Sequence, residues 1–409
     1  MYLVVIHIPI YVEGDRYYTD ISWQRDLLLA RDWLARPFRY LTLLAPSLPI
    51  EAVDDKIVHP VPIGADDGIR VVPSFDLRCR ARHFWLKQRR QWMADVRREL
   101  CEAKVIHTSA DDVFRPLSFL AHGTAVKSNV TTVLVGPDMD YHAILPANVR
   151  GRLICFVFDL LMRRATRRAD LVLLKEGLVH DRYARYGKNV KAFCGSMHRD
   201  EDVIGETQLE RRLETLQRNR PLRAVYAGRF IPRKGLHDAV AAIAIARQKD
   251  VAVEYHLFGS GPEESALRRQ AAELGVQDLV SFQGFVEYSP QFIAHLAEFD
   301  LLLFMPTEED TPRMLYDAMA AGLPLLGSRI PFLSHRVKTD QAGVLVNVGD
   351  SNGAAEHLRS FHAEPERLKK MARSARAAGG RHSVEKWYQR RADWTMEAVQ
   401  RHLSKDAAQ

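Results

Sequence analysis

The sequence predicts an α/β protein in two domains, each built on a parallel sheet with helices on both faces. Two features of the chain support this prediction. Its 409 residues, 47% hydrophobic and 27% charged, have an ordinary globular composition at a length that favours two domains. Short apolar runs alternate with longer amphipathic runs, which is the pattern of successive strands and helices in such folds.

In the N-terminal half, short apolar runs predict buried strands at Leu3–Ile10, Tyr40–Leu44, Lys104–Thr108, Thr131–Val135 and Leu171–Leu174. Helical patterns lie between several of them, at Ser22–Leu34, Arg82–Leu100 and Gly151–Arg168. We therefore predict a Rossmann-like domain over residues 1–200.

Residues 201–221 have dense mixed charge and few apolar side chains, so we predict an interdomain linker there. A second Rossmann-like domain is predicted over residues 222–380. Its strands are expected at Arg223–Ala227, Glu254–Phe258, Leu279–Phe282, Leu301–Phe304, Pro324–Leu326 and Gly343–Val346. Its helices are expected near Leu236–Ala246, Pro262–Leu274, Pro290–Phe299 and Arg313–Ala321. A final helix, Ser383–His402 within residues 381–409, has to dock on a domain already built.

The net charge of +7 suits anionic ligands: nucleotide diphosphates, nucleic acid or an anionic membrane surface. The four cysteines, Cys79, Cys101, Cys155 and Cys194, form no C-x-x-C pair, which indicates reduced thiols in a cytoplasmic protein. No run reaches the roughly 18 apolar residues of a membrane-spanning helix. We expect a protein that is soluble or peripheral on a membrane.

The most specific motif runs from Glu309 to Asp317 and is followed by Ala-Met-Ala-Ala-Gly. A predicted strand enters a loop that holds Glu309, and a helix is expected to start near Pro312. A helix N-terminus suits a phosphate, and Asp317, one turn into the helix, can reach a ribose hydroxyl. For an isolated acidic pair, attraction to the helix dipole alone would be a sufficient explanation.

Two further turns also follow predicted strands. In Ala227–Gly235, Arg229 and Lys234 can approach a diphosphate together and neutralise the charge of a leaving nucleotide. In Phe258-Gly-Ser-Gly-Pro262, two glycines allow a ligand to approach the backbone closely. The simpler interpretation of the first segment is an exposed basic turn, and that of the second is an ordinary tight turn without a ligand.

The order and intervals of these three motifs resemble those of glycosyltransferase family 4, which contains retaining enzymes of the GT-B fold. The resemblance is specific over about Arg223–Asp350 and only architectural over the N-terminal half. It implies two Rossmann-like domains whose parallel sheets face a central cleft, with a C-terminal helix that crosses back to the N-terminal domain.

The resemblance also implies roles for individual residues. Arg229 and Lys234 match positions that contact the donor diphosphate, Glu309 matches a contact to the donor sugar, and Asp317 matches a contact to the ribose. Backbone at Gly284, Phe285 and Val286 is expected to meet the base. The remaining expected donor-binding residues are Gly14, Gly228, Gly259, Gly261, Asp310 and Thr311. His107 is expected to face the sugar, and a core histidine at a strand end is the alternative.

The implied reaction transfers a sugar, with retained configuration, from a UDP or GDP donor to a saccharide or lipid-linked acceptor, without a metal or other cofactor. The chain departs from the family pattern at Asp317, where glutamate is usual, and at Asp310, where glycine is common. Only Gly14 stands where many relatives have a glycine pair. The pair Asp138 and Asp140 is not expected to hold a metal, because such pairs belong to a different glycosyltransferase fold.

Two basic segments with interleaved apolar residues, 79–104 and 150–168, are compatible with an anionic membrane surface. In the first, Trp85, Trp92, Val96 and Leu100 share one predicted helical face. Packing of the apolar residues on the sheet explains either segment equally well. Nucleic acid is not expected, because no reader motif is present. Two other functions stay open: a nucleotide-sugar hydrolase or epimerase of the same fold, and a degenerate nucleotide-binding subunit at a membrane.

Overall fold

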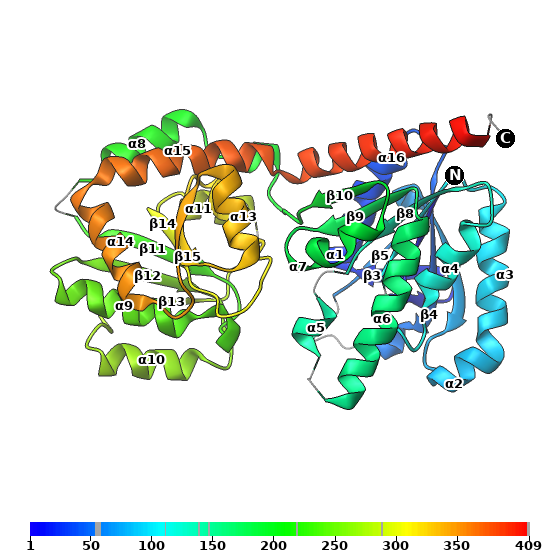
Figure 1. Ribbon diagram of the computed structural model, residues 1–409, viewed down its shortest axis with the longest axis horizontal. Helices are drawn as coiled ribbons and strands as arrows, with labels where there is room; N and C mark the ends of the chain where they lie inside the picture. Colours follow the sequence, from blue (N-terminus) through cyan, green and yellow to red (C-terminus); the bar gives the residue numbers. More distant parts are fainter. Residues whose placement is uncertain are drawn as a thin grey trace. The chain divides into compact units, whose positions relative to one another are not determined.

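The computed structural model describes residues 1–53, 59–110, 112–137, 140–145, 148–217, 220–287 and 289–406. The chain divides into two compact units. Unit 1 comprises Met1–Phe193 and Tyr388–Gln409, and unit 2 comprises Cys194–Trp387. Each unit has its own sheet with helices packed against it, as Figure 1 shows, which confirms the predicted α/β architecture.

The sheet of unit 1 has the order β10-β9-β8-β7-β1-β4-β2-β3-β5, and β6 pairs with β4. Its strands are β1 Tyr2–Val5, β2 Ile10–Glu13, β3 Arg16–Asp20, β4 Leu41–Pro49, β5 Pro60–Pro62, β6 Ile69–Asp76, β7 Val105–Ser109, β8 Thr131–Val135, β9 Leu171–Lys175 and β10 Val190–Phe193. The pairs are parallel except that β3 runs antiparallel to β2 and β5.

The helices of unit 1 are α1 Ile21–Leu29, α2 Ala81–His83, α3 Arg89–Leu100, α4 Leu117–Ala125, α5 Tyr141–Ile144, α6 Val149–Arg168 and α7 Leu178–Tyr183. A π-helical turn at Ala30–Leu34 extends α1, and another at Phe84–Gln88 joins α2 to α3. The predicted helices Ser22–Leu34 and Arg82–Leu100 are therefore continuous in direction but irregular in hydrogen bonding.

The predicted first strand is shorter than expected. The chain leaves the sheet after Val5, and Pro9, which has no N–H to donate, precedes the second strand. Strands β2 and β3 then form a hairpin in which Glu13 pairs with Arg16. Gly14 lies in the turn of this hairpin with a φ of +58°, a conformation that favours glycine.

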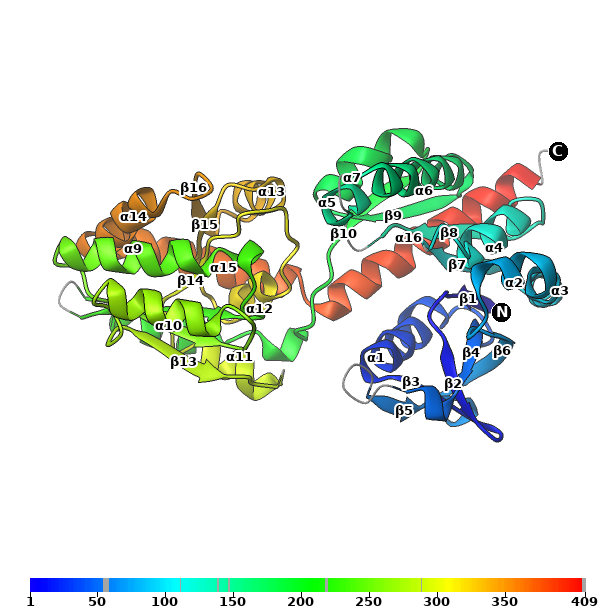
Figure 2. The same cartoon turned by 90° about the horizontal axis from the view of Figure 1, so that it is seen from below.

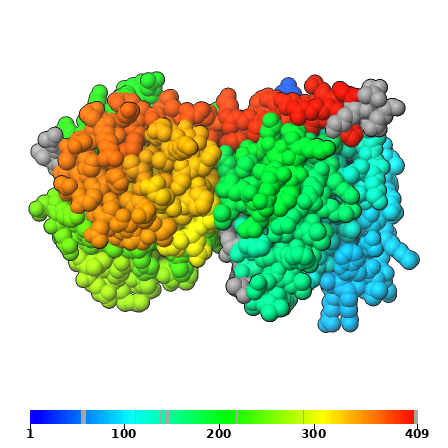
Figure 3. All heavy atoms as spheres, viewed as in Figure 1, coloured from blue at the N-terminus to red at the C-terminus, as the bar shows by residue number. Residues whose placement is uncertain are grey.

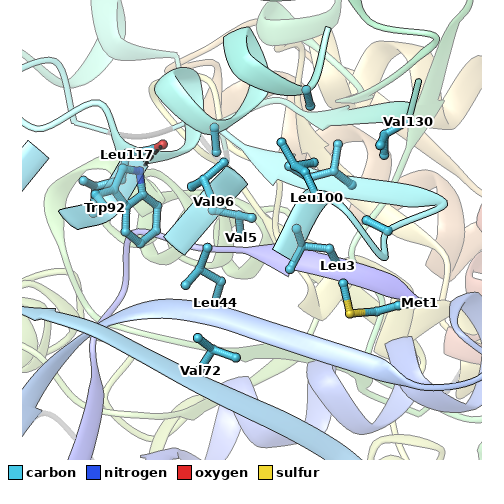
Figure 4. Packing of buried hydrophobic residues seen from close by; sticks show 14 of the residues in the cluster. Met1, Leu3, Val5, Leu44, Val72, Trp92, Val96, Leu100, Leu117 and Val130 are labelled. Atoms are coloured by element: carbon cyan, nitrogen blue, oxygen red, sulfur yellow. Dashed lines mark hydrogen bonds between the residues drawn. The ribbon is translucent and has the colours of Figure 1, made fainter. Parts of the chain in front are cut away.

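A buried cluster joins α3 and α4 to the central strands of unit 1. Figure 4 shows Trp92, Val96 and Leu100 of α3 over Val5 and Leu44 of the sheet. The Trp92 indole N–H donates to the carbonyl of Leu117 at 3.1 Å, so the one polar group of this large buried side chain has a hydrogen-bond partner. Burial of side chains of this size contributes about 1.5–3 kcal/mol each. This explains why the apolar stripe of α3 faces the sheet.

The sheet of unit 2 is parallel and has the order β13-β12-β11-β14-β15-β16. Its strands are β11 Leu222–Ala227, β12 Val253–Phe258, β13 Val280–Gly284, β14 Leu301–Phe304, β15 Leu325–Ser328 and β16 Gly343–Val346. Its helices are α8 Glu206–Glu214, α9 Leu236–Gln248, α10 Glu264–Glu273, α11 Pro290–Leu296, α12 Met314–Ala320, α13 Pro331–Asp340, α14 Ser351–Ala363 and α15 Pro365–Arg381.

The segment predicted as a linker, 201–221, lies within unit 2. It contains α8, whose Leu209 and Leu213 are both 1% exposed. Arg212 of the same helix donates to the carbonyls of Ala297, Ala321 and Gly322. Two leucines four residues apart and one partly buried arginine therefore attach to unit 2 a segment that is rich in charged side chains.

The last helix, α16 Val384–Asp406, begins in unit 2 and belongs to unit 1 from Tyr388 onward. The Tyr388 hydroxyl donates to the carbonyl of Asp26, and the Arg391 guanidinium lies 5.5 Å from the ring centre of Phe193. The expected return of the C-terminal helix to the N-terminal domain is confirmed.

Candidate functional site

The strand order of unit 2 reverses between β11 and β14. Strands β12 and β13 lie on one side of β11, and β14 to β16 lie on the other. In open parallel sheets, ligands bind beyond the carboxyl ends of the strands at such a reversal. The loops that leave β11 and β14 there carry Arg229, Lys234 and Glu309. The topology therefore brings together motifs about 80 residues apart in sequence.

The loops after β11 and β14 touch each other closely. Gly235 has a φ of +63°, and a Cβ atom there would lie 1.6 Å from the carbonyl oxygen of Met305. The Thr307 N–H donates to the carbonyl of Arg233 at 3.1 Å. Only glycine fits at position 235, so this residue fixes the basic turn against the acidic loop. The sequence interpretation did not assign it a role, although its place at the end of the basic turn was a usable signal.

The expected glycines at 228, 259 and 261 hold the loops after β11 and β12 together. A Cβ atom on Gly259 would lie 2.0 Å from the carbonyl oxygen of Gly228, and one on Gly261 would lie 2.3 Å from that of Phe230. The Gly228 N–H donates to Phe258, and the Gly259 N–H donates to Gly284. Close packing of backbone on backbone is thus one reason for these glycines, and it also keeps side chains away from this edge.

The centre of the candidate site is a pair of partly buried cations that share one carboxylate. The Lys234 ammonium is hydrogen-bonded to the Asp310 carboxylate, and Arg233 Nη1 lies 3.1 Å from the same oxygen of Asp310. The side chains of Lys234 and Asp310 are 12% and 9% exposed. Burial lowers the pKa of Lys234, and the charge of Asp310 opposes this shift. Arg233, which the motif interpretation passed over, is therefore part of the cluster.

Arg229 lies in the same turn, and its side chain is exposed. Its backbone carbonyl accepts a hydrogen bond from the Tyr226 hydroxyl at 3.2 Å. The positive charge of Arg229 contributes to lowering the pKa of Lys234, as does that of Arg233. The structure thus brings Arg229 and Lys234 together, with one cation open to solvent and the other largely enclosed.

Glu309 reaches the start of a third element. The N–H of Phe332, in the first turn of α13, donates to Glu309 Oε2 at 3.4 Å. An anion at a helix N-terminus is stabilised by the helix dipole and by the free N–H groups. The Glu309 carboxylate is thus held at the carboxyl edge of the sheet, between the loops after β14 and β15.

Asp317 is more enclosed than expected. Helix α12 begins at Met314 rather than near Pro312, and Asp317 in its first turn is 5% exposed. Its Oδ1 atom lies 4.0 Å from Nδ1 of His198, which is fully buried. Burial lowers the pKa of His198, and its Nε2 atom lies 2.8 Å from the carbonyl oxygen of Gly379. Thr311 lies in the segment before α12 and is partly buried.

The expected base-binding segment follows β13 at the same edge of the sheet. Gly284 has a φ of +76°, and its carbonyl accepts the Gly259 N–H at 2.7 Å. Phe285 and Val286 are 78% and 41% exposed. This segment therefore presents an apolar surface next to the glycine turn after β12.

His107 and Gly14 lie in unit 1, His107 in the middle of β7 and Gly14 in the hairpin turn described above. His107 Nδ1 lies 3.0 Å from the Tyr2 hydroxyl. Burial lowers the pKa of His107 to about 3, with a smaller contribution from the charge of Arg391. The alternative interpretation, a core histidine at a strand end, differs from the structure in that His107 is partly buried in the middle of β7, and its expected role facing the sugar stays a prediction.

Within the described part of the chain, no group of histidine, cysteine, aspartate or glutamate side chains has the arrangement of a metal site. Asp138 lies outside the described residues. Asp140 binds Arg182, with 2.8 Å between Oδ2 and Nη2, and it caps α5 by accepting the N–H of His142. Among the helices that the structure describes, none combines the length and apolar composition needed to cross a bilayer.

Residues 209–378, most of unit 2, match the sequence family described as "Glycosyl transferases group 1". A glycogen synthase of Mycobacterium tuberculosis (strain H37Rv) is 30% identical over 159 residues, which cover 39% of this chain and 38% of that protein. The lipopolysaccharide core biosynthesis glycosyltransferase LpsE of Rhizobium meliloti is 27% identical over 137 residues, covering 34% and 38%. The chain thus spans less than two fifths of the length of these curated relatives.

Solved structures match over nearly the whole chain. Anabaena Alr3699/HepE, solved in complex with UDP, aligns with a TM-score of 0.66 at 16% identity and covers 97% of this chain and 99% of its own. WaaG, a glycosyltransferase involved in lipopolysaccharide biosynthesis, aligns with a TM-score of 0.56 at 14% identity, covering 96% and 99%. The predicted fold is confirmed: the chain has the GT-B fold of these glycosyltransferases, and its unit 2 contains the segment that matches group 1.

Proposed function

We propose that the protein is a glycosyltransferase of family 4 that moves a sugar from a nucleotide-diphosphate donor to a saccharide or lipid-linked acceptor. The product would be a cell-surface polysaccharide or a glycolipid. One observation carries the proposal: the loops that hold Arg229, Lys234 and Glu309 leave β11 and β14 at the strand-order reversal of the unit that matches group 1. Relatives named for glycogen, colanic acid and lipopolysaccharide core synthesis support this class of product.

The donor would bind along the carboxyl edge of the unit 2 sheet. Arg229 and Lys234 would contact the diphosphate, Glu309 the sugar, Asp317 the ribose, and the backbone of Gly284 to Val286 the base. Cations that are partly removed from water bind phosphate oxygens more strongly than exposed ones. UDP is the first candidate, because a solved structure of the same fold contains it, and GDP is the second.

The proposed reaction retains the configuration of the sugar. The bond between the anomeric carbon and the phosphate oxygen breaks, and a bond from that carbon to an acceptor hydroxyl oxygen forms on the same face. The acceptor proton goes to the leaving phosphate. Lys234 and Arg229 neutralise the charge that develops on the nucleotide, so the residues of the chain supply this stabilisation without a metal.

Transfer of labelled sugar to a membrane or polysaccharide extract tests the proposal, with Lys234→Ala and Glu309→Ala compared to the wild type. We expect each variant to lose about a hundredfold or more in rate. Lys249→Ala is the matched control, since Lys249 pairs with Glu356 at the surface of the same unit and is expected to leave the rate unchanged. Full activity in both site variants would refute the proposal.

A thermal-shift screen of UDP, GDP, ADP and their sugars identifies the donor, because a bound ligand raises the apparent stability. Rapid loss of donor without acceptor would instead favour a hydrolase. A cytoplasmic location stays a prediction from the four isolated cysteines. Contact with an anionic membrane through segments 79–104 or 150–168 is part of the proposal.

A further inference from the structure

Helix α6 exposes a row of large apolar side chains. Val149, Leu153, Phe156 and Leu160 are 86%, 60%, 67% and 59% exposed. Their spacing of four, three and four residues places them on one face of the helix, over about 16 Å of its length. Figures 1 and 3 show α6 along the surface of unit 1. We call these four residues the α6 stripe.

The α6 stripe is not needed to hold the helix on its sheet. Phe158, Met162 and Ala165 on another face of α6 are buried against Leu134 of β8 and Val172 of β9. The Phe158 ring also stacks on Tyr141, with 4.0 Å between the ring centres. Figure 2 shows α6 lying along the sheet of unit 1. Four exposed apolar side chains beyond a complete buried face indicate a binding surface.

The exposed charged residues of α6 itself are all arginines. Between residues 149 and 168 the chain has six arginines, at 150, 152, 163, 164, 167 and 168. The one acidic residue of this segment, Asp159, is buried. Its carboxylate accepts hydrogen bonds from the Tyr183 hydroxyl at 2.6 Å and from Arg163 at 3.2 Å. No uncompensated negative charge of α6 therefore opposes an anionic partner.

We propose that the α6 stripe inserts into the headgroup region of an anionic phospholipid bilayer, with the flanking arginines on the lipid phosphates. A helix with an apolar row and a basic border has this chemistry. A second copy of α6 fits poorly, because it would bring a further six arginines to the same face. The inference deepens the proposed membrane contact and does not depend on the transfer reaction, which uses residues of unit 2.

The other predicted membrane segment, 79–104, keeps little apolar surface. Trp92, Val96 and Leu100 of its predicted stripe are 0%, 0% and 6% exposed, because they pack in the core of unit 1. Trp85 and Leu86 stay exposed, and the Trp85 indole N–H donates to the carbonyl of Phe114. Two exposed residues on a π-helical turn are a smaller apolar surface than the α6 stripe, so we assign membrane contact to α6.

Flotation of the full chain with phosphatidylcholine vesicles that contain or lack phosphatidylglycerol tests this assignment. We expect binding only to the anionic vesicles, and weaker binding as salt is added. Leu153→Glu and Phe156→Glu should each reduce vesicle binding by about tenfold or more, because each replaces an inserted apolar group by a charge. Both variants should still bind the nucleotide, which separates this test from that of the proposed function.

Two variants with the same substitution elsewhere serve as controls. Leu403→Glu on α16 and Leu86→Glu in segment 79–104 change side chains that are 58% and 77% exposed. We expect both to float like the wild type. The inference is overturned if wild-type chain ignores anionic vesicles, or if Leu86→Glu lowers binding while Leu153→Glu does not. It is also overturned if the chain is a dimer that Leu153→Glu converts to a monomer, since the stripe would then join two copies.

Discussion

At the scale of single residues, the carboxylate of Asp310 occupies the position beside Lys234 where we propose that the donor diphosphate binds. It accepts a hydrogen bond from Lys234 and lies beside Arg233, so both cations are partly neutralised before a donor binds. A diphosphate at this position would compete with Asp310 for the same cations. One of the two residues that depart from the family pattern therefore acts directly on the charges of the candidate site.

Asp310→Asn should increase the affinity for UDP. The amide keeps the shape of the side chain but removes its charge, and we expect the Kd to fall by about tenfold because Lys234 and Arg233 become free for phosphate. The protein without ligand should melt at a lower temperature, since two partly buried cations lose their counterion. Calorimetric titration with UDP measures the first effect and a thermal scan the second.

Asp278→Asn provides the control for this substitution, because Asp278 binds Arg247 at 2.6 Å on the surface of the same unit. It should leave the Kd for UDP unchanged. If Asp310→Asn binds UDP no better than the wild type, the carboxylate does not compete with the donor.

His107 should make unit 1 less stable in acid. Burial lowers its pKa from 6.5 to about 3, so the folded chain disfavours the charged ring. Below about pH 6.5 the unfolded chain takes up a proton that the folded chain does not, and stability is lost progressively down to pH 3. His107→Gln should reduce this pH dependence, as measured by urea unfolding at pH 7 and pH 5.

His83→Gln, on the exposed side of α2, is the comparison for this measurement and should retain the wild-type pH dependence. An identical loss of stability between pH 7 and pH 5 in His107→Gln and wild type would show that other groups cause the acid sensitivity. The result also bears on catalysis, because a ring kept neutral at pH 7 cannot act there as a general acid.

At the scale of elements, the six strands of unit 2 and the central strands of unit 1 are predictable, whereas several outer strands of unit 1 are not. Strands β1, β9 and β14 are almost continuous apolar runs because both of their faces are covered. Strand β5 has three residues, two of them proline, and β6 includes Pro73, so neither matches a strand pattern. The hairpin β2–β3 is polar and exposed near its turn, where periodicity carries no signal.

The sequence predicts which residues belong to the candidate site, but it does not predict which of their side chains contact each other. The spacing of the motifs locates Arg229, Lys234 and Glu309, because each follows a strand that the apolar runs identify. The contact between Lys234 and Asp310 joins positions 76 residues apart, and it depends on the fit of the two loops around Gly235. Side-chain contacts of that kind follow from packing, which a single sequence does not specify.

Gly235→Ala should disrupt the candidate site through the backbone. The added methyl group would collide with the Met305 carbonyl, and alanine is strained at a φ of +63°. We therefore expect the free energy of unfolding to fall by more than about 2 kcal/mol. UDP binding should also be lost. Gly14→Ala is the control that has the backbone strain without the steric collision, because Gly14 has a φ of +58° and no atom lies within 4 Å of the added Cβ. It should cost about 1 kcal/mol and leave UDP binding intact. Equal thermal shifts in the two variants would contradict the proposed collision.

At the scale of the whole molecule, the chain passes from one unit to the other twice, once after Phe193 and once after Trp387. Inside unit 2, the segment that follows the first passage is hydrogen-bonded to the segment that precedes the second. The Val384 N–H donates to the carbonyl of His198, and the Ser383 hydroxyl donates to Asp200. Unit 1 is therefore completed by a segment that follows the whole of unit 2 in the sequence. Unit 1 can finish folding only after the residues from Tyr388 onward have been synthesised.

Removal of residues 388–409 should destabilise unit 1 and leave unit 2 folded. The deleted part of α16 includes Tyr388, buried in unit 1, and Arg391, which lies 5.5 Å from the ring of Phe193. It also includes Trp394, whose ring Lys191 covers at 5.8 Å. Hydrogen exchange should show faster exchange in β10, β1 and β7 of the truncated chain, while β11, β12 and β14 keep their protection. A shorter deletion of residues 403–409 keeps Tyr388, Arg391 and Trp394 and should preserve both patterns. Loss of protection in β11 after the longer deletion would mean that unit 2 depends on the returning helix for its own stability.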